Sequence, residues 1–99
     1  MAFDYSNSNS RWQALRERIL RRDGYRCQEA ARYGKAVEAN TVHHIWPADE
    51  FPEWAYEPWN LVSLSAAAHG RMHDKITHRL TALGERWRRN TPPPRQANV

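Results

Sequence analysis

The histidine pattern between residues 41 and 73 constrains the fold of this 99-residue chain more than any other feature. Four of the five histidines lie there: the adjacent pair His43-His44, and the pair His69 and His73. Residues 41–45 and 59–64 have strand-like patterns, whereas 68–73 resembles the opening of a helix. Neighbours in a strand point to opposite faces, and helix residues four apart share a face. One strand histidine and two helix histidines therefore predict a metal site with three nitrogen ligands. The other strand histidine is left for proton chemistry.

A zinc protease is one alternative, because HxxxH on a helix is typical of that class. Its motif requires glutamate directly after the first histidine as general base. Gly70 occupies that position here, so the sequence excludes this alternative.

Four stretches together resemble the HNH (ββα-metal) nucleases: Arg21–Gln28, Val42–Pro47, Trp59–Leu64 and His69–Asp74. The resemblance spans roughly Trp12 to Trp87. It is strongest to small HNH proteins of phages and prophages, and the histidine arrangement is also similar to that of colicin-type toxin nucleases. The resemblance implies an α+β fold: a ββα-metal core, made of an antiparallel two-stranded hairpin plus a helix, with flanking N- and C-terminal helices.

The resemblance also implies roles for individual residues. His43, His69 and His73 would hold one divalent ion, and His44 would be the general base. Asn60 would either orient the base through its side-chain oxygen or join the metal shell. An alternative for His73 is a histidine that only closes the helix near its C-terminus.

Arginines supply the candidate substrate contacts. Arg71, between the ligands, is a candidate phosphate clamp, with a plain surface arginine as the alternative. Arg18 and Arg22 belong to an arginine-rich helix face that would contact DNA or merely aid solubility.

The donor set leaves the metal open among Mg, Mn, Ni and Zn. Three neutral imidazoles favour the borderline ions, whereas substrate phosphate would supply the oxygens that Mg or Mn prefers.

Many HNH proteins also carry two CxxC pairs for a structural zinc. Here those pairs read Cys27…Ala30 and Ser65…Ala68, so three of the four thiolate positions are lost. We expect no structural zinc. We expect some of the aromatic residues of the loop to fill the volume that the zinc site occupies in those proteins; the candidates are Trp46, Phe51, Trp54 and Tyr56.

Charge and cysteine content narrow the partners. The net charge of +4 and pI near 9.7 indicate a polyanionic partner. Residues 36–69 hold no Lys or Arg and five acids, so the basic residues flank the histidine pattern. One cysteine excludes an internal disulfide and indicates a reducing compartment, which predicts a cytoplasmic location. We expect no contact with a membrane, because no apolar run is long enough to span one and the first residues do not resemble a signal peptide.

Punctuation residues divide the chain. We expect residues 1–9 to be a disordered N-terminus, 10–90 the nuclease domain, and 91–99 a disordered, Pro-rich tail. Ser10 with Gln13 predicts a capped helix start, and Asp23-Gly24 predicts its end. Residues 46–58 read as a long ordered loop. The motif helix should end near 75–78, and a second helix should cover 81–90.

The sequence therefore predicts a metal-dependent DNA endonuclease of phage or prophage DNA processing, which hydrolyses phosphodiester bonds. The alternative is a catalytically inactive, HNH-derived DNA-binding module. The resemblance further implies work beside the phage packaging terminase. The choice of DNA or RNA and the oligomeric state stay open at this level.

Overall fold

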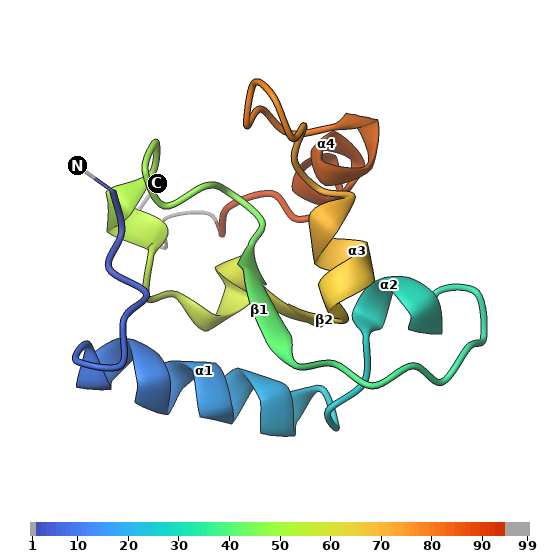
Figure 1. Cartoon of the computed structure of the whole chain (residues 1–99), viewed down its shortest axis with the longest axis horizontal. Coiled ribbons are helices and arrows are strands. Elements are labelled where there is room, and N and C mark those ends of the chain that lie inside the picture. The colour runs from blue at the N-terminus through green and yellow to red at the C-terminus, as the bar shows by residue number, and fades with distance from the viewer. Residues whose placement is uncertain (1, 95–99) are drawn as a thin grey trace.

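A two-stranded antiparallel hairpin lies at the centre of the computed structural model, which describes residues 2–94 (Figure 1). Strand β1 (Thr41–His44) pairs with β2 (Leu61–Leu64), with Thr41 opposite Leu64 and His44 opposite Leu61. β2 begins later than the sequence predicted because Pro58–Asn60 forms a 3₁₀ turn, η2, which leads into the strand. The predicted α+β class with a ββα-metal core and flanking helices is confirmed.

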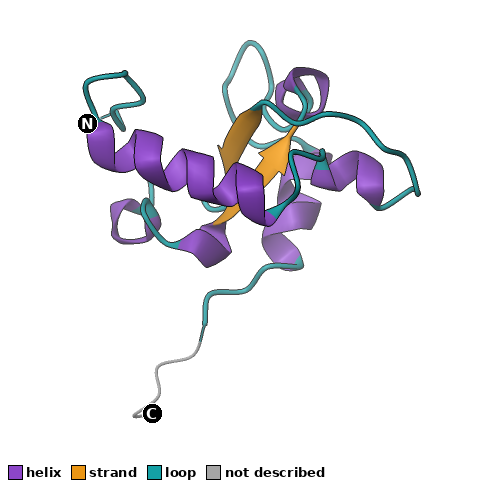
Figure 2. Ribbon diagram, turned by 90° about the horizontal axis from the view of Figure 1, so that it is seen from below, coloured by secondary structure: helices purple, strands orange, loops and turns teal. Residues whose placement is uncertain are grey.

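Helix α1 (Ser10–Arg22) lies across one face of the hairpin (Figure 2). Its apolar stripe is buried and forms a core with Val42 and Leu61; the stripe consists of Trp12, Leu15, Ile19 and Leu20. The cap differs from the predicted one, since the Asn9 side chain, one residue earlier, accepts from the Trp12 N–H. The end is as predicted: Gly24 adopts a φ of +65°, which a glycine takes without strain.

Helix α3 (Ala66–Gly70) is shorter than the sequence predicted. The chain leaves the helix before His73, and His73 forms an isolated antiparallel bridge with Leu80. α3 ends at Gly70, where the N–H groups of Arg71 and Met72 bond to the carbonyls three residues back, and the Asp74 carboxylate then accepts from the N–H groups of Ile76 and Thr77 in the turn that follows. Such side-chain-to-backbone bonds compete with helical ones. The predicted helix end at 75–78 is therefore wrong.

Helix α4 (Ala82–Arg89) confirms the second predicted helix and packs closely on the turn that carries His73. Its N-cap Thr81 accepts from the Gly84 N–H and donates to the Arg71 carbonyl. Gly84 is buried, and a Cβ added there would lie only 2.6 Å from the Met72 carbonyl oxygen. The close approach of α4 therefore requires glycine at this position.

The four positions that hold zinc thiolates in many HNH proteins converge on one spot, although only Cys27 is a cysteine. Cys27, Ala30, Ser65 and Ala68 line one surface groove beside the short helix α2 (Gln28–Ala31). Packing holds this region together: Cys27, Ala68 and Met72 are buried in one hydrophobic cluster, and Trp87 packs against that cluster. The Trp87 indole also donates to the buried Glu29 carboxylate at 2.8 Å, which ties α4 to α2.

The loop between the strands is ordered, as its composition predicted, and includes the 3₁₀ turn η1 (Pro52–Trp54). Of its aromatic residues, Trp46 packs against the hydrophobic cluster around Cys27, so it helps to fill the region where many HNH proteins hold a structural zinc. Phe51 and Trp54 instead stack on each other, with ring centroids 5.0 Å apart.

The N-terminal segment differs from the expected disorder, since the described residues 2–9 lie beside the start of α1 (Figure 1) and Phe3 packs against the core that α1, β1 and β2 share. Phe3 packs edge-on against Trp12, with centroids 5.2 Å apart, and its N–H donates to the Asp49 carboxylate. Two aromatic side chains in an otherwise polar segment explain this, because both gain by covering apolar surface. Of the predicted disordered tail, residues 95–99 lie outside the described residues, and the Thr91 carbonyl accepts from the Trp46 indole. Within residues 2–94, no helix has the length and apolar character needed to cross a membrane.

Candidate metal centre and catalytic histidine

Three histidines from three separate parts of the fold converge on one point. His43 comes from β1, His69 from the last turn of α3, and His73 from the turn after it. Each offers one ring nitrogen, and these nitrogens all lie within 4.8 Å of one another. The structure thus brings together the predicted set His43, His69 and His73, which we call the histidine cluster. It does so without the helical i, i+4 geometry that the sequence suggested for His73.

The chemistry of the cluster fits a divalent metal ion. Nε2 of His43 is the one buried side-chain nitrogen or oxygen within the described residues that lacks a hydrogen-bond partner. Burial lowers the pKa of His43 well below its ordinary value, and the neighbouring His69 and His73 lower it further. Burial likewise lowers the pKa of His69. Both imidazoles are therefore neutral at physiological pH, which is the form that binds metals.

His44 faces away from the histidine cluster, as strand alternation requires. Its Nε2 lies 2.9 Å from the Ala55 carbonyl oxygen, and its Nδ1 lies 2.9 Å from the Tyr5 hydroxyl. A carbonyl only accepts, so we assign the ring proton to Nε2, which leaves the lone pair on Nδ1. The Trp12 ring stacks on the imidazole at 5.0 Å between centroids. Burial lowers the pKa of His44, against the opposing effects of the Ala55 carbonyl and Asp49.

Asn60 fills neither of the roles predicted for it. Its side-chain oxygen accepts from the Trp46 N–H at 2.7 Å, and its amide donates to the carbonyls of Trp46 and Trp54. It is fully buried and belongs to neither the histidine cluster nor the contacts of His44. Asn60 instead closes the loop between the strands. Since Ala55 follows Trp54, Asn60 positions the carbonyl that holds the His44 ring.

A cavity of about 420 Å³ joins the two faces of this site. It is lined by His43, His44, His69 and His73, by Tyr5 of the N-terminal segment, and by Trp12, Gln13 and Arg16 of α1, among others. Sequence reasoning missed Tyr5 and Arg16. Arg16 could have been found from its spacing, because it follows Trp12 by four residues and so shares its helix face. Tyr5 carried no such signal within a polar segment.

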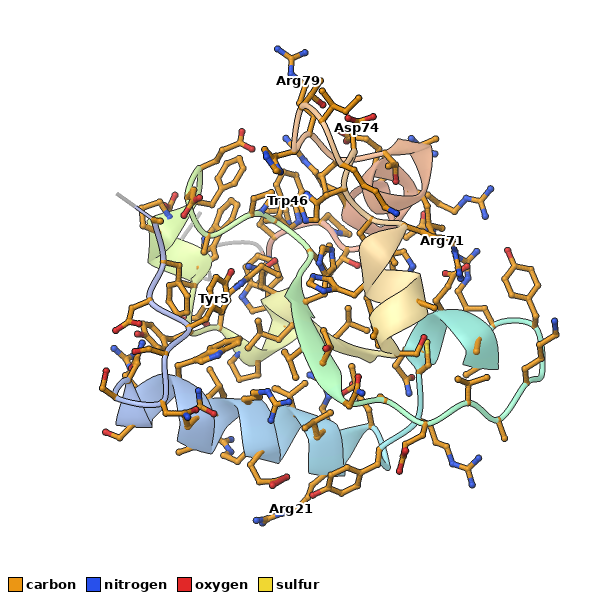
Figure 3. All side chains as sticks on the ribbon, viewed as in Figure 1. Tyr5, Arg21, Trp46, Arg71, Asp74 and Arg79 are labelled. Carbon is orange, nitrogen blue, oxygen red and sulfur yellow. The ribbon has the colours of Figure 1, made fainter. Side chains whose placement is uncertain are left out.

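The three predicted substrate arginines lie away from this cavity's lining. Arg71 lies at the outer side of α3 (Figure 3), where it lines the groove beside Cys27. Arg22 serves the scaffold: its guanidinium pairs with Asp23 and donates to the carbonyls of Pro58 and Leu61. Arg18 is exposed on α1, where it is free to face a polyanion.

The contact of Gly84 with residue 72 leads to a prediction about the cluster. Gly84→Ala should push α4 away from the turn carrying His73, destabilise the fold by ~1–3 kcal/mol, and weaken metal binding. Calorimetry and thermal unfolding would measure both effects. Gly70→Ala is the matched control, since an added Cβ there meets no atom within 4 Å. Equal metal affinity in the two variants would contradict the dependence of His73 on α4.

Comparison with known proteins gives a single line of support. No family model matches the sequence, and no curated protein matches it. Among solved structures, the chain is similar to the HNH endonuclease of the deep-sea thermophilic bacteriophage GVE2, crystallised with a manganese ion. The two are 31% identical, with a TM-score of 0.63, over 65% of this chain and 70% of the phage protein. On this similarity and on the ββα architecture, the chain belongs to the HNH endonuclease family.

Proposed function

We propose that this protein is a metal-dependent DNA endonuclease that hydrolyses phosphodiester bonds. The observation that supports this most is that the two adjacent histidines of β1, His43 and His44, lie in two different environments. His43 belongs to the histidine cluster and has an unpartnered Nε2, whereas His44 lies outside the cluster, lines the same cavity and carries a lone pair at Nδ1. Metal-assisted hydrolysis needs both a metal grip and a separate proton acceptor.

His43, His69 and His73 would hold the divalent ion. When bound, such an ion supplies Lewis-acid stabilisation to a phosphate and to the leaving oxygen. Manganese accompanies the phage protein, and the imidazole donors also suit Ni or Zn, while Mg would depend more on phosphate oxygens.

His44 would act as the general base. Its Nδ1 accepts a proton from water, while the Ala55 carbonyl keeps the Nε2 proton in place and fixes the ring against rotation. Stacking on Trp12 restrains the imidazole plane as well. Asn60 acts one step further out, as a positioning residue that fixes the loop carrying Ala55.

Arg16 is the cation best placed to hold a substrate phosphate in the cavity. Arg16→Ala should lower cleavage of bound DNA by roughly 10- to 100-fold, the scale of a lost charge-assisted hydrogen bond. Arg18→Ala, on the exposed helix face, should instead reduce the salt dependence of binding, by roughly 0.9 in log–log slope for one phosphate. Single-turnover cleavage and binding at several salt concentrations separate the two. An Arg16→Ala variant that cleaves like wild type would remove Arg16 from the site.

The wider role is proposed from family membership. DNA is the substrate we favour, with Arg18 and other exposed arginines of α1 beside the backbone. A part in phage or prophage DNA processing is supported by the phage origin of the similar structure. A cytoplasmic location is proposed from the single cysteine, and work beside the packaging terminase from the sequence resemblance.

The test is a cleavage assay on plasmid DNA, single strands and RNA, with Mg, Mn, Ni and Zn in turn and with chelator. We expect nicking or linearisation of plasmid that chelator abolishes and one of these ions restores. DNA binding without cleavage under every condition would instead identify an inactive DNA-binding module.

A further inference from the structure

Aromatic side chains of the N-terminal segment, together with Trp12, enclose the imidazole ring of His44, the proposed general base. Phe3 and Tyr5 contact the His44 ring edge-on, with centroids 5.1 and 5.7 Å away, while Trp12 stacks on its face. Figure 3 shows the Tyr5 side chain on this N-terminal segment, at the side of the cavity near β1. Phe3 and Tyr5 therefore form part of the surroundings of the His44 ring.

The Tyr5 hydroxyl occupies the only lone pair that the base has. With the Ala55 carbonyl on Nε2, a neutral His44 ring accepts solely at Nδ1, and the hydroxyl lies 2.9 Å from that atom. Burial of the hydroxyl, with the nearby Asp49 charge, raises the pKa of Tyr5 to about 12, so this group stays protonated and donates. A water that is to lose its proton needs the same atom.

The contacts that hold Tyr5 in place are weak enough to exchange. The residue is 53% exposed overall, although its hydroxyl is turned inward. Its backbone carbonyl accepts only a 3.3 Å bond from the Gln13 side-chain amide, and the segment is fixed further by the bond from the Phe3 N–H to the Asp49 carboxylate. A long, solvent-accessible bond between neutral groups, such as the one from Gln13, contributes little net stability.

We propose that Tyr5 is a further residue of the catalytic centre, whose hydroxyl covers His44 Nδ1 and must leave it before water is activated. This rests on the proposed role of His44 as general base. The hydroxyl and the attacking water compete for one acceptor, so the enclosure is closed at rest and opens for each turnover. Tyr5 lines the cavity that substrate would enter, so a bound substrate would lie beside its side chain.

Tyr5→Phe tests this, because it removes the hydroxyl and keeps the ring contacts with Phe3 and Trp12. We expect single-turnover cleavage to rise about two- to tenfold, the population shift that one neutral hydrogen bond sustains. Tyr33→Phe is the matched control, an exposed tyrosine away from the cavity, and should leave the rate unchanged. A Tyr5→Phe rate equal to or below wild type would overturn the proposal.

A second measurement needs neither metal nor activity. Diethyl pyrocarbonate acylates imidazole nitrogens that have a free lone pair, and peptide fragmentation distinguishes His44 from His43. We expect faster modification of His44 in Tyr5→Phe than in wild type and Tyr33→Phe; an unchanged rate would show that the hydroxyl does not cover Nδ1. If His44→Ala cleaved like wild type, the base assignment would fail, and this measurement would still decide separately whether Tyr5 covers the ring.

Discussion

His44→Ala should reduce DNA cleavage by ~10²–10⁴-fold, the usual contribution of a general base. The loss should lie in the chemical step, because His44 faces away from the histidine cluster and contacts Ala55 and Tyr5 instead. Metal affinity, measured by calorimetric titration, should therefore stay close to wild type. Single-turnover kinetics at saturating protein would show the lost rate without a change in DNA binding.

The comparison with His43→Ala makes this result decisive. If His44→Ala bound metal poorly while His43→Ala bound it normally, the two faces of β1 would carry the opposite roles. His44→Gln is a useful companion, since it retains a side-chain amide donor for the Ala55 carbonyl but has no proton acceptor of comparable basicity. It should remain as inactive as His44→Ala while recovering stability.

His43→Ala should have the largest effect on metal binding. His43 is the central, most buried member of the cluster, with only 1% of its surface exposed, and its Nε2 has no other partner. Affinity for Mn, Ni or Zn should fall by more than the roughly 10–100-fold typical of a lost outer-shell partner. Cleavage should fall with it, and calorimetry with each ion would measure the loss.

A control and a second ligand define the boundaries of the site. His78→Asn removes a histidine outside the cluster at a position of positive φ, which asparagine tolerates, and should leave metal affinity unchanged. His73→Ala should weaken Zn or Ni binding more than Mg binding, because imidazole matters most to borderline ions. Equal affinity to wild type for every ion would show that His73 only supports the turn.

The sequence predicted those parts of the site in which short-range periodicity sets the geometry. Alternation along β1 separated His43 from His44, and helical spacing placed Trp12 and its partners in the core. It failed for His73: α3 ends at Gly70, so His73 reaches the cluster from a turn, in which Asp74 bonds to the backbone instead of continuing the helix.

Contacts between distant segments were also beyond prediction from sequence. Asn60 bonds to Trp46 and Trp54 by way of a loop fold that no spacing reveals. Tyr5 reaches His44 across thirty-nine positions, and its value lies in a surface that exists only after α1 and β1 have packed. Arg16 is different, because its four-residue spacing from Trp12 indicated the helix face that lines the cavity.

The position of His73 after the end of α3 has a consequence for folding. A metal ion shared by His43 and His73 would act as a reversible crosslink, closing a chain loop between β1 and the turn against which α4 packs. Binding to the native state alone adds stability as ligand concentration rises, about 2.7 kcal/mol at a hundredfold excess over Kd. The C-terminal part of the fold, from the turn at His73 through α4, would then be the region whose opening chelators promote. Metal supply would set the lifetime of the protein against proteolysis as well as its activity.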